Sequence, residues 1–496
     1  MQRHTKLAFR FGAWLCIFLL LPVIMFSALA EDQGDQDKFI PPKEPSDANP
    51  YDPEHPENLQ EDQLIATSAI LIEANTGEVI FEKNADQRMF PASTTKIMTV
   101  FLGLTIGKSN DMMDETVTIS DEDVNLPEDA SVIPLSAGET IRFEDLLYAT
   151  MVRSGNEGAN AIAEAISGSI PDFADLMNET ANYMGCTDTH FVNPNGLQDE
   201  NHYTTARDMA IIAKEAMNNS TFRQIAATTS YQLPKSNMQK ARTVSNSNNA
   251  LMVQGENNKY YYGYANGIKT GFHNQAGYCY VGSASKDGVS LISVVFYTSS
   301  TGRWTDTKKL MEYGFSQYVS VSPVELYDMN PIVLETTGFS KDDQDLGRLP
   351  LNLVPLDTSA TAAIVATRTQ VESMARNLQQ YVIIEYIRDF AAPINAGEQM
   401  GTLTYFPPDG SDPVEYGLVA SRSIQIRENA PKSIEEIIKE TYDDPNPFPR
   451  ITLELIVMAL LPIGGLFLVI RITRRVSKRF SGKGGALPKP TTRRFR

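Results

Sequence analysis

Strand patterns at both ends of a helical middle constrain the fold of this chain more than any other feature. Alternating apolar residues predict two strands within 66–82, joined by a turn at Asn75-Thr76-Gly77, and two more over 276–284 and 289–297. Helical periodicity occurs over residues 93–104, 143–151, 157–166, 205–216 and 305–318. We therefore predict an α/β (α+β) fold, in which helices flank an antiparallel sheet and the first and last strand segments are adjacent.

A different pattern begins beyond Val321. Short runs rich in β-branched residues alternate with turns such as Pro408-Asp409-Gly410, which predicts a smaller all-β domain over 320–430. One helical stretch is expected within it, around 370–377. The first domain then occupies residues 62–319.

The first 30 residues predict a secretory signal peptide. A basic start that ends at Arg10 precedes an apolar run over 11–26, and Ala28-Leu29-Ala30 has the small-x-small pattern of a cleavage site. An uncleaved N-terminal anchor is the alternative, and either version exports the chain that follows. Residues 31–61 are rich in Asp, Glu, Pro and Asn, which predicts a flexible acidic leader.

The other end of the chain predicts a membrane anchor. Residues 451–470 are almost wholly apolar, with Glu454 near one end, and such a length suffices to cross the hydrocarbon core of a bilayer. A buried core helix is the alternative, but the basic run from Arg471 to Lys483 contains no acidic residue and retains this end in the cytoplasm. The predicted parts are a juxtamembrane stalk helix over 431–450, a transmembrane helix over 451–471 and a basic cytoplasmic tail over 472–496.

The uneven distribution of charge excludes some classes of function. Subtracting the +3 of residues 1–30 and the +9 of residues 451–496 from the formal charge of −18 leaves −30 on residues 31–450. Because nucleic-acid binding rests on Lys and Arg contacts to phosphate, so acidic a body predicts no nucleic-acid partner. The cysteines and histidines show no metal-ligand spacing, so neither a metal nor an organic cofactor is expected. Cys186 and Cys279 could form one disulfide or remain two separate buried thiols.

The chemistry is predicted from three short motifs, which are Ser93-Thr94-Thr95-Lys96, Ser154-Gly155-Asn156 and Lys269-Thr270-Gly271. Pro91 and Ala92 lead into an apolar helical run, which places Ser93 at a helix N-terminus, where backbone N–H groups stabilise a developing oxyanion. Lys96 lies one turn later on the same face, within reach of the Ser93 hydroxyl. Burial, together with the second cation Lys269, would favour the neutral amine, which can take the hydroxyl proton. The pattern predicts Ser93 as nucleophile and Lys96 as its base.

The second motif falls in a glycine-containing loop between two predicted helices. Taken alone, such a loop often only caps a helix. Beside the first motif, we expect Ser154 to pass a proton to the leaving amine and Asn156 to hydrogen-bond the substrate backbone.

The third motif is predicted to open a strand that borders the site. Lys269 and Thr270 would then hold a substrate carboxylate, and Gly271 would let the substrate backbone approach closely. The backbone N–H groups of Ser93 and Phe272 would form the oxyanion hole.

Together these motifs are the signature set of penicillin-binding proteins and class A β-lactamases. The sequence resembles the low-molecular-weight penicillin-binding proteins, the serine-type D-alanyl-D-alanine carboxypeptidases. Further blocks that resemble this family lie at 153–165, 191–197, 204–208, 266–271, 312–315 and 392–403. The resemblance covers residues 62–430 and implies a β-lactamase/transpeptidase-like catalytic domain.

The resemblance also implies a function. The enzyme would remove the terminal D-alanine from peptidoglycan stem pentapeptides through a Ser93 acyl-enzyme, and β-lactams would acylate it. With the predicted topology, it would be a single-pass protein of the bacterial cell membrane whose catalytic body is extracytoplasmic. A full membrane span departs from the amphipathic surface helix of many members. Glu157 stands where many relatives have Asp, and Asn195 stands where some have His; we assign Asn195 no role.

Three alternatives use the same motifs. A β-lactamase would need an additional glutamate to activate the deacylating water, and Glu179 is the nearest candidate, although its helical setting indicates an exposed face. An endopeptidase would cut D-alanyl cross-links. A non-catalytic wall-associated protein would keep the motifs without becoming acylated.

Overall fold

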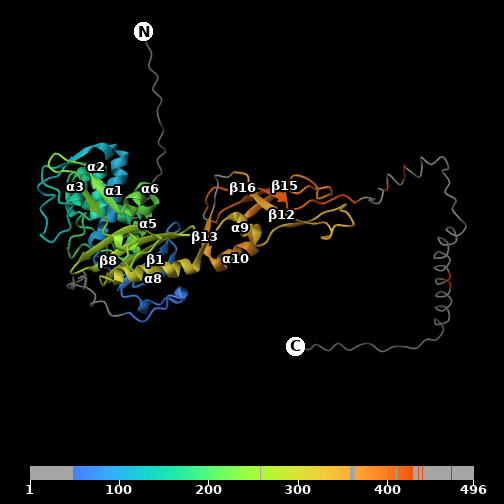
Figure 1. Ribbon diagram of the computed structural model, residues 1–496, viewed down its shortest axis with the longest axis horizontal. Helices are drawn as coiled ribbons and strands as arrows, with labels where there is room; N and C mark the ends of the chain where they lie inside the picture. The colour runs from blue at the N-terminus through green and yellow to red at the C-terminus, as the bar shows by residue number, and fades with distance from the viewer. Residues whose placement is uncertain are drawn as a thin grey trace, which may run out of the picture. The chain divides into compact units, whose positions relative to one another are not determined.

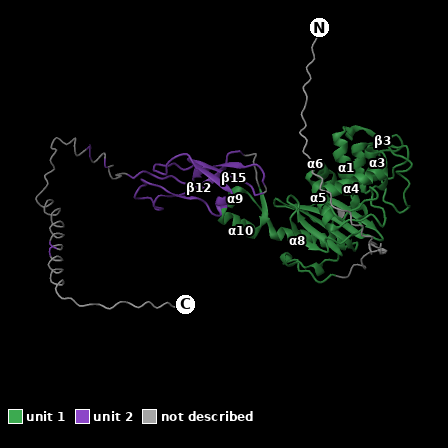
Figure 2. Ribbon diagram, turned by 180° about the vertical axis from the view of Figure 1, so that it is seen from behind, with its two compact units in different colours: residues 1–326, 361–377 green, residues 327–360, 378–496 purple. Residues whose placement is uncertain are grey.

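The computed structural model describes residues 48–256, 258–357, 363–408 and 410–427, with a few single positions beyond them. The chain divides into two compact units, which Figure 2 colours separately. One unit holds the residues up to Leu326 and residues 361–377, and the other holds residues 327–360 and those from Leu378 onward. The predicted signal peptide, stalk, transmembrane helix and basic tail lie outside the described residues, apart from those single positions. Among the residues that are described, no helix is both long enough and apolar enough to cross a bilayer.

The first unit is built on a five-stranded antiparallel sheet in the order β2-β1-β9-β8-β7. Its strands are β1 (Ser68–Glu73), β2 (Val79–Lys83), β7 (Ala265–His273), β8 (Gly277–Lys286) and β9 (Val289–Thr298). β1 pairs with β9, with Ser68 opposite Phe296, so the first and last strand segments are adjacent. The predicted antiparallel sheet is confirmed.

Helices cover both faces of this sheet (Figure 1). They are α1 (Lys96–Ser109), α2 (Phe143–Arg153), α3 (Asn156–Ser167), α4 (Ile170–Tyr183), α5 (Ala206–Asn218), α6 (Ser220–Ala227), α7 (Asn249–Met252) and α8 (Gly302–Gln317). Neighbouring side chains of a strand point to opposite faces. Ile70 and Ile72 of β1 therefore join the core formed with α1 to α6, whereas Leu71 packs in a second core with Trp304 and Leu310 of α8.

The sequence patterns do not predict α6, and they indicate α4 only through the helical setting of Glu179. Each begins at a capping side chain: Ser169 accepts from the Asp172 N–H, and Asn219 accepts from the N–H groups that follow it. α6 is only eight residues long, which is too short a window for its three buried residues to stand out as a helical period. The unit also contains two small two-stranded sheets, β3 (Thr116–Thr118) with β4 (Thr140–Arg142) and β5 (Ser230–Leu233) with β6 (Arg242–Ser245).

Part of the predicted flexible leader is ordered. Residues 48–61 carry the turns η1 (Pro56–Asn58) and the start of η2 (Glu61–Gln63), and η1 packs along α8. Leu59 is only 4% exposed and lies in the same core as Trp304. A few apolar anchors thus offset the entropy of ordering this segment, which its average composition does not reveal.

The second unit contains another five-stranded antiparallel sheet, in the order β11-β12-β16-β15-β14. Its strands are β11 (Val333–Glu335), β12 (Arg348–Pro355), β14 (Val382–Tyr386), β15 (Gln399–Tyr405) and β16 (Val414–Ala420). Alternate residues of β12, namely Leu349, Leu351 and Leu353, are buried, so one face of the sheet forms the core.

Residues 361–377 interrupt the region predicted as a single all-β domain. β13 (Ile364–Thr367) pairs with β10 (Tyr318–Val321) of the first unit, which draws this segment back to that unit. Helix α10 (Arg368–Arg376) follows directly, and Thr367 and Gln370 close a capping box at its start. The short helix α9 (Pro323–Asp328) lies at the boundary between the two units.

Candidate active site

Ser93 lies in a tight helical turn that runs directly into α1. The turn η3 (Ala92–Thr95) is followed without a break by Lys96, the first residue of α1. Lys96 Nζ therefore comes round to lie 3.0 Å from Ser93 Oγ. Lys96 is fully buried, while Ser93 is partly exposed and lines a cavity. The structure thus brings together the two residues predicted as nucleophile and base.

Lys96 is held by hydrogen bonds to two carbonyl oxygens, and its burial favours the neutral amine. Two carbonyl oxygens accept hydrogen bonds from Lys96 Nζ, Asn156 Oδ1 at 2.5 Å and the backbone oxygen of Asn195 at 2.6 Å. Burial lowers the pKa of Lys96 well below its ordinary value of 10.5, and the nearby Lys269 cation lowers it further. The Glu157 carboxylate acts in the opposite direction.

The second motif forms the junction between α2 and α3. α2 ends at Arg153, and Ser154 follows in the left-handed conformation with a φ of 67°. This conformation turns the chain, and α3 begins at Asn156. Ser154 is 7% exposed and lines the same cavity as Ser93. Asn156 was expected only to bind substrate, but in this structure its Oδ1 also accepts from Lys96.

The third motif lies within β7, and the prediction that it opens a strand is wrong. β7 already begins at Ala265, because β8 offers a pairing partner from that residue onward. β7 is the edge strand of the sheet, so its outer backbone edge is unpaired within the sheet. Lys269 is fully buried, and burial together with the nearby Arg303 lowers its pKa to about 7. Thr270 Oγ1 donates to Ser247 Oγ at 2.7 Å.

Two glycines allow the turn around Ser93 to be packed closely from both sides. A Cβ at Gly196, whose φ is +85°, would lie 1.9 Å from the Ala92 carbonyl oxygen. A Cβ at Gly271 would lie 2.8 Å from the Pro91 oxygen and 3.2 Å from the Ser93 nitrogen. Gly271 was predicted to admit the substrate backbone; in the structure it also lets β7 itself approach the turn.

A buried histidine supports this turn from behind. His202 Nε2 lies 2.8 Å from Thr95 Oγ1, and Thr95 Oγ1 donates to the Ala92 carbonyl at 2.8 Å. The Val192 N–H donates to His202 Nδ1, which places the imidazole proton on Nε2. Burial lowers the pKa of His202 to about 3, so the ring is neutral near neutral pH. A single histidine ahead of a helix gives no sequence signal for this role.

A cavity of about 790 Å³ connects the three motifs. Its lining includes Ser93, Ser154, Asn156, Thr270, Gly271 and Phe272 of the predicted site. Lys96 and Lys269 are fully buried, and each contacts a residue that lines the cavity. Lys96 Nζ lies against Ser93 Oγ, and Lys269 Nζ donates to the Thr270 backbone oxygen. The Phe272 ring is half-exposed and stacks on Tyr278, with ring centroids 4.3 Å apart.

Arg303 also lines this cavity, and the sequence analysis did not identify it. It lies in the first turn of α8, and its guanidinium packs over the rings of Tyr278 and Trp304 at 4.7 and 4.4 Å. No local motif marks this residue, because it comes close to Lys269 only through the pairing of β7, β8 and β9.

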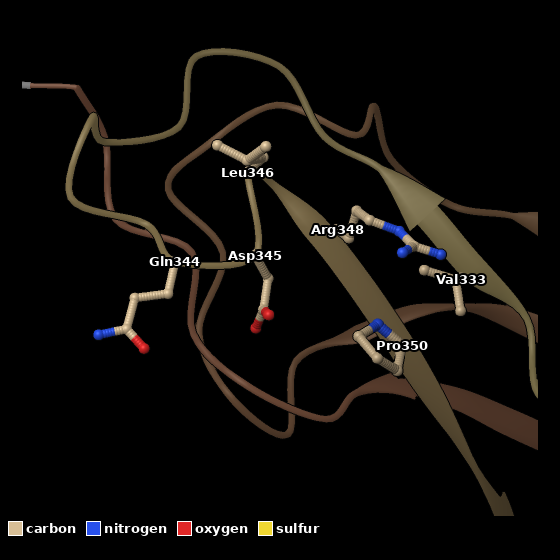
Figure 3. A pocket seen from close by; sticks show the side chains of 6 residues that line it. All are labelled: Val333, Gln344, Asp345, Leu346, Arg348 and Pro350. Atoms are coloured by element: carbon tan, nitrogen blue, oxygen red, sulfur yellow. The ribbon is translucent and has the colours of Figure 1, made fainter.

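Other predicted candidates lie away from the site. Glu179 is exposed on α4 and does not line the cavity, so the structure does not supply it as the glutamate a β-lactamase needs. Cys186 and Cys279 are two separate buried free thiols. A second cavity of about 430 Å³ lies in the second unit, where β11, β12 and the loop between them provide its side chains (Figure 3). It contains none of the predicted site residues.

The matching family model and two curated relatives share one description. Residues 55–300 match the peptidase family described as D-alanyl-D-alanine carboxypeptidase. The D-alanyl-D-alanine carboxypeptidase DacF of Bacillus subtilis is 32% identical over 340 residues, which cover 68% of this chain and 80% of that protein. DacA of Haemophilus influenzae has the same description and is 29% identical, over 73% of this chain and 85% of the length of DacA. The crystal structure of the Streptomyces K15 DD-transpeptidase matches this chain with 31% sequence identity and a TM-score of 0.46. The match covers 51% of this chain and 98% of the transpeptidase chain.

Proposed function

The chain belongs to the D-alanyl-D-alanine carboxypeptidase family and is a serine-type carboxypeptidase of peptidoglycan metabolism, and we propose that its reaction proceeds through an acyl-enzyme on Ser93. The observation that carries this proposal is the fully buried Lys96 amine, 3.0 Å from Ser93 Oγ. An amine whose pKa is held well below 10.5 can accept the serine proton near neutral pH.

We infer that the substrate is a peptidoglycan stem pentapeptide that ends in D-alanyl-D-alanine. The free outer edge of β7 can pair with an extended peptide backbone. Its terminal carboxylate would then bind at Lys269, Thr270 and Arg303, where two cationic side chains come close together. A carboxylate bound there supports exopeptidase cleavage, because it places the last residue of the peptide directly after the bond that Ser93 attacks.

Acylation then follows from the positions of the remaining groups. Lys96 takes the Ser93 proton while Oγ attacks the carbonyl carbon between the two D-alanines. The N–H groups of Ser93 and Phe272 stabilise the resulting oxyanion, since Gly271 holds β7 close to the Ser93 nitrogen. The proton passes from Lys96 through Ser154 to the leaving nitrogen of D-alanine, and the C–N bond breaks. Water then hydrolyses the ester, with Lys96 again taking the proton.

The same site would react with β-lactams. Their strained amide carbonyl would occupy the oxyanion hole, and their carboxylate would take the place of the substrate carboxylate near Lys269. Ser93 Oγ would open the ring and remain acylated.

We further propose that the catalytic domain, residues 62–319, is extracytoplasmic. The signal peptide over 1–30 would export it, and the apolar segment 451–471 would hold it to the bacterial cell membrane with the basic tail inside. The ten cations of residues 471–496 would also contact anionic lipid heads, each worth about 1 kcal/mol near the surface.

The test uses the full chain in detergent with two substrates, a D-alanyl-D-alanine pentapeptide and a cross-linked peptide dimer. Mass spectrometry follows the products of the unmodified protein and of Ser93→Ala. We expect release of D-alanine from the pentapeptide and none with Ser93→Ala. Cleavage of the dimer in preference to the pentapeptide would identify an endopeptidase, and release of D-alanine by Ser93→Ala would refute the mechanism.

A further inference from the structure

The hydrogen bonds of Lys96 determine where its lone pair points. Nζ has three close partners, Ser93 Oγ at 3.0 Å, Asn156 Oδ1 at 2.5 Å and the Asn195 backbone oxygen at 2.6 Å. The two carbonyl oxygens can only accept, whereas the serine hydroxyl can also donate. A neutral amine that donates to both carbonyls therefore directs its lone pair at the hydroxyl. The orientation of these two carbonyls decides whether Lys96 can act as a base.

The Asn195 carbonyl is held in place by a pair of asparagine side chains. Asn195 Nδ2 donates to Asn160 Oδ1 at 2.8 Å, and Asn195 Oδ1 accepts from the Leu197 N–H at 2.9 Å. Asn160 Nδ2 in turn donates to the Asp123 carbonyl at 3.2 Å. Asn160 and Asn195 are only 4% and 3% exposed, so water does not compete for these bonds.

Helix α3 links the two carbonyls to each other. Asn156 and Asn160 are four residues apart and lie on the same face of α3. Asn156 contacts Lys96 directly, and Asn160 reaches it through Asn195. One helix face thus fixes both acceptors.

We propose that the hydrogen bond between Asn160 and Asn195 positions the Asn195 carbonyl, and through it directs the lone pair of Lys96 at Ser93. Asn160 and Asn195 are positioning residues in this proposal, and Asn160 does not line the cavity. The proposal rests on the proposed role of Lys96 as the base.

Removing this bond would change the rate of acylation more than substrate affinity. In Asn160→Ala the carbonyl is free to tilt, and the amine loses its alignment. Misalignment of a general base costs about 10-fold in the acylation rate. The KM for the peptide should stay within 2-fold, because the carboxylate-binding groups Lys269 and Arg303 are unchanged.

The pH profile gives a readout that loss of stability would not produce. A carbonyl that accepts from Nζ stabilises the ammonium form of Lys96 more than the amine. In Asn160→Ala, the acid limb of the pH profile of the acylation rate should therefore move to lower pH by about 0.5 pH unit. Asn160→Asp keeps an acceptor for Asn195 Nδ2 but adds a negative charge, so the limb should move higher. The other titratable groups that act on Lys96, namely Lys269, Glu157 and His202, stay the same in both variants. Position 160 contacts the backbone oxygen of Asp123; burial raises the pKa of the Asp123 carboxyl to about 6.

The experiment measures acylation of the full chain in detergent by a fluorescent penicillin from pH 5 to 10. The variants are Asn160→Ala, Asn195→Ala, the double variant and Asn160→Asp. Asn178→Ala is the matched control, because Asn178 also makes two hydrogen bonds, both to the Phe191 backbone in the segment before Asn195. We expect equal 10-fold losses in the two single alanine variants, no further loss in the double variant, and less than 2-fold in the control.

Several outcomes would overturn the proposal. Additive losses in the double variant, a control as slow as Asn160→Ala, or acid limbs that shift in the same direction in Asn160→Ala and Asn160→Asp would each refute it. If Asn160→Ala does not fold, the shift in Asn160→Asp alone decides. Failure of the proposed function is distinguishable, because the unmodified protein would then not be acylated at Ser93.

Discussion

Replacing Gly196 by alanine tests whether the close packing around Ser93 is needed for catalysis. The new Cβ would lie 1.9 Å from the Ala92 oxygen, whereas real Cβ contacts are essentially never shorter than 3.0 Å. The turn and the Gly196 loop must therefore separate by about 1 Å, and a displacement of this size at a reacting group costs about 100-fold in rate. A 100-fold loss corresponds to about 2.7 kcal/mol of transition-state stabilisation.

The backbone strain of this substitution needs its own control. Gly168 has a φ of +81°, close to that of Gly196, but nothing lies within 4 Å of its Cβ position. Both alanine variants should lose about 1 kcal/mol of unfolding free energy from the left-handed backbone. Only Gly196→Ala should also lose acylation.

The assay combines thermal unfolding with the rate of acylation by a fluorescent penicillin, at a temperature where all three proteins are folded. We expect Gly168→Ala to react as fast as the unmodified protein and Gly196→Ala about 100-fold more slowly. Equal acylation rates in the two variants would show that the turn tolerates displacement, and the reasoning would be refuted.

Three further substitutions test the electrostatics and the proton path. Lys269 is a cation below its pKa of about 7, so kcat/KM of the unmodified enzyme should fall as the pH rises above 7. The Lys269→Arg variant stays charged, and this fall at alkaline pH should disappear from its pH profile. Glu157 raises the pKa of Lys96, so Glu157→Gln should move the acid limb of acylation to lower pH, and an unchanged limb would rule out this coupling. Ser154→Ala should slow D-alanine release about 100-fold while the circular dichroism spectrum stays the same, and full activity would remove Ser154 from the proton path.

Local rules were sufficient where the partners are close in sequence. Ser93 and Lys96 are three residues apart on a helical turn, so their spacing alone predicted the contact seen at 3.0 Å. The strands over 276–284 and 289–297 were also predicted from local patterns, and in the structure Asp287 and Gly288 between them both have a positive φ, which suits a two-residue hairpin.

Residues that act through the tertiary fold could not be found this way. Arg303 approaches Lys269 only after β7, β8 and β9 have paired, and Asn160 gains its role only when the loop around Asn195 packs against α3. The ordered segment before Leu64 was missed because Leu59 is buried by α8, which lies some 240 residues later in the chain. The average composition of a segment does not reveal that one of its residues, such as Leu59, is buried by a distant helix.

The most direct test of the whole account is a titration of the Lys96 amine in the unliganded full chain. NMR of lysine labelled with ¹³C at Cε, with the Lys96 signal assigned by its loss in Lys96→Arg, follows the protonation of each amine with pH. Burial and the Lys269 cation predict a midpoint well below 10.5, so that neutral Lys96 is available to Ser93. A midpoint at the ordinary value would mean that Lys96 is a cation at the working pH and cannot be the base.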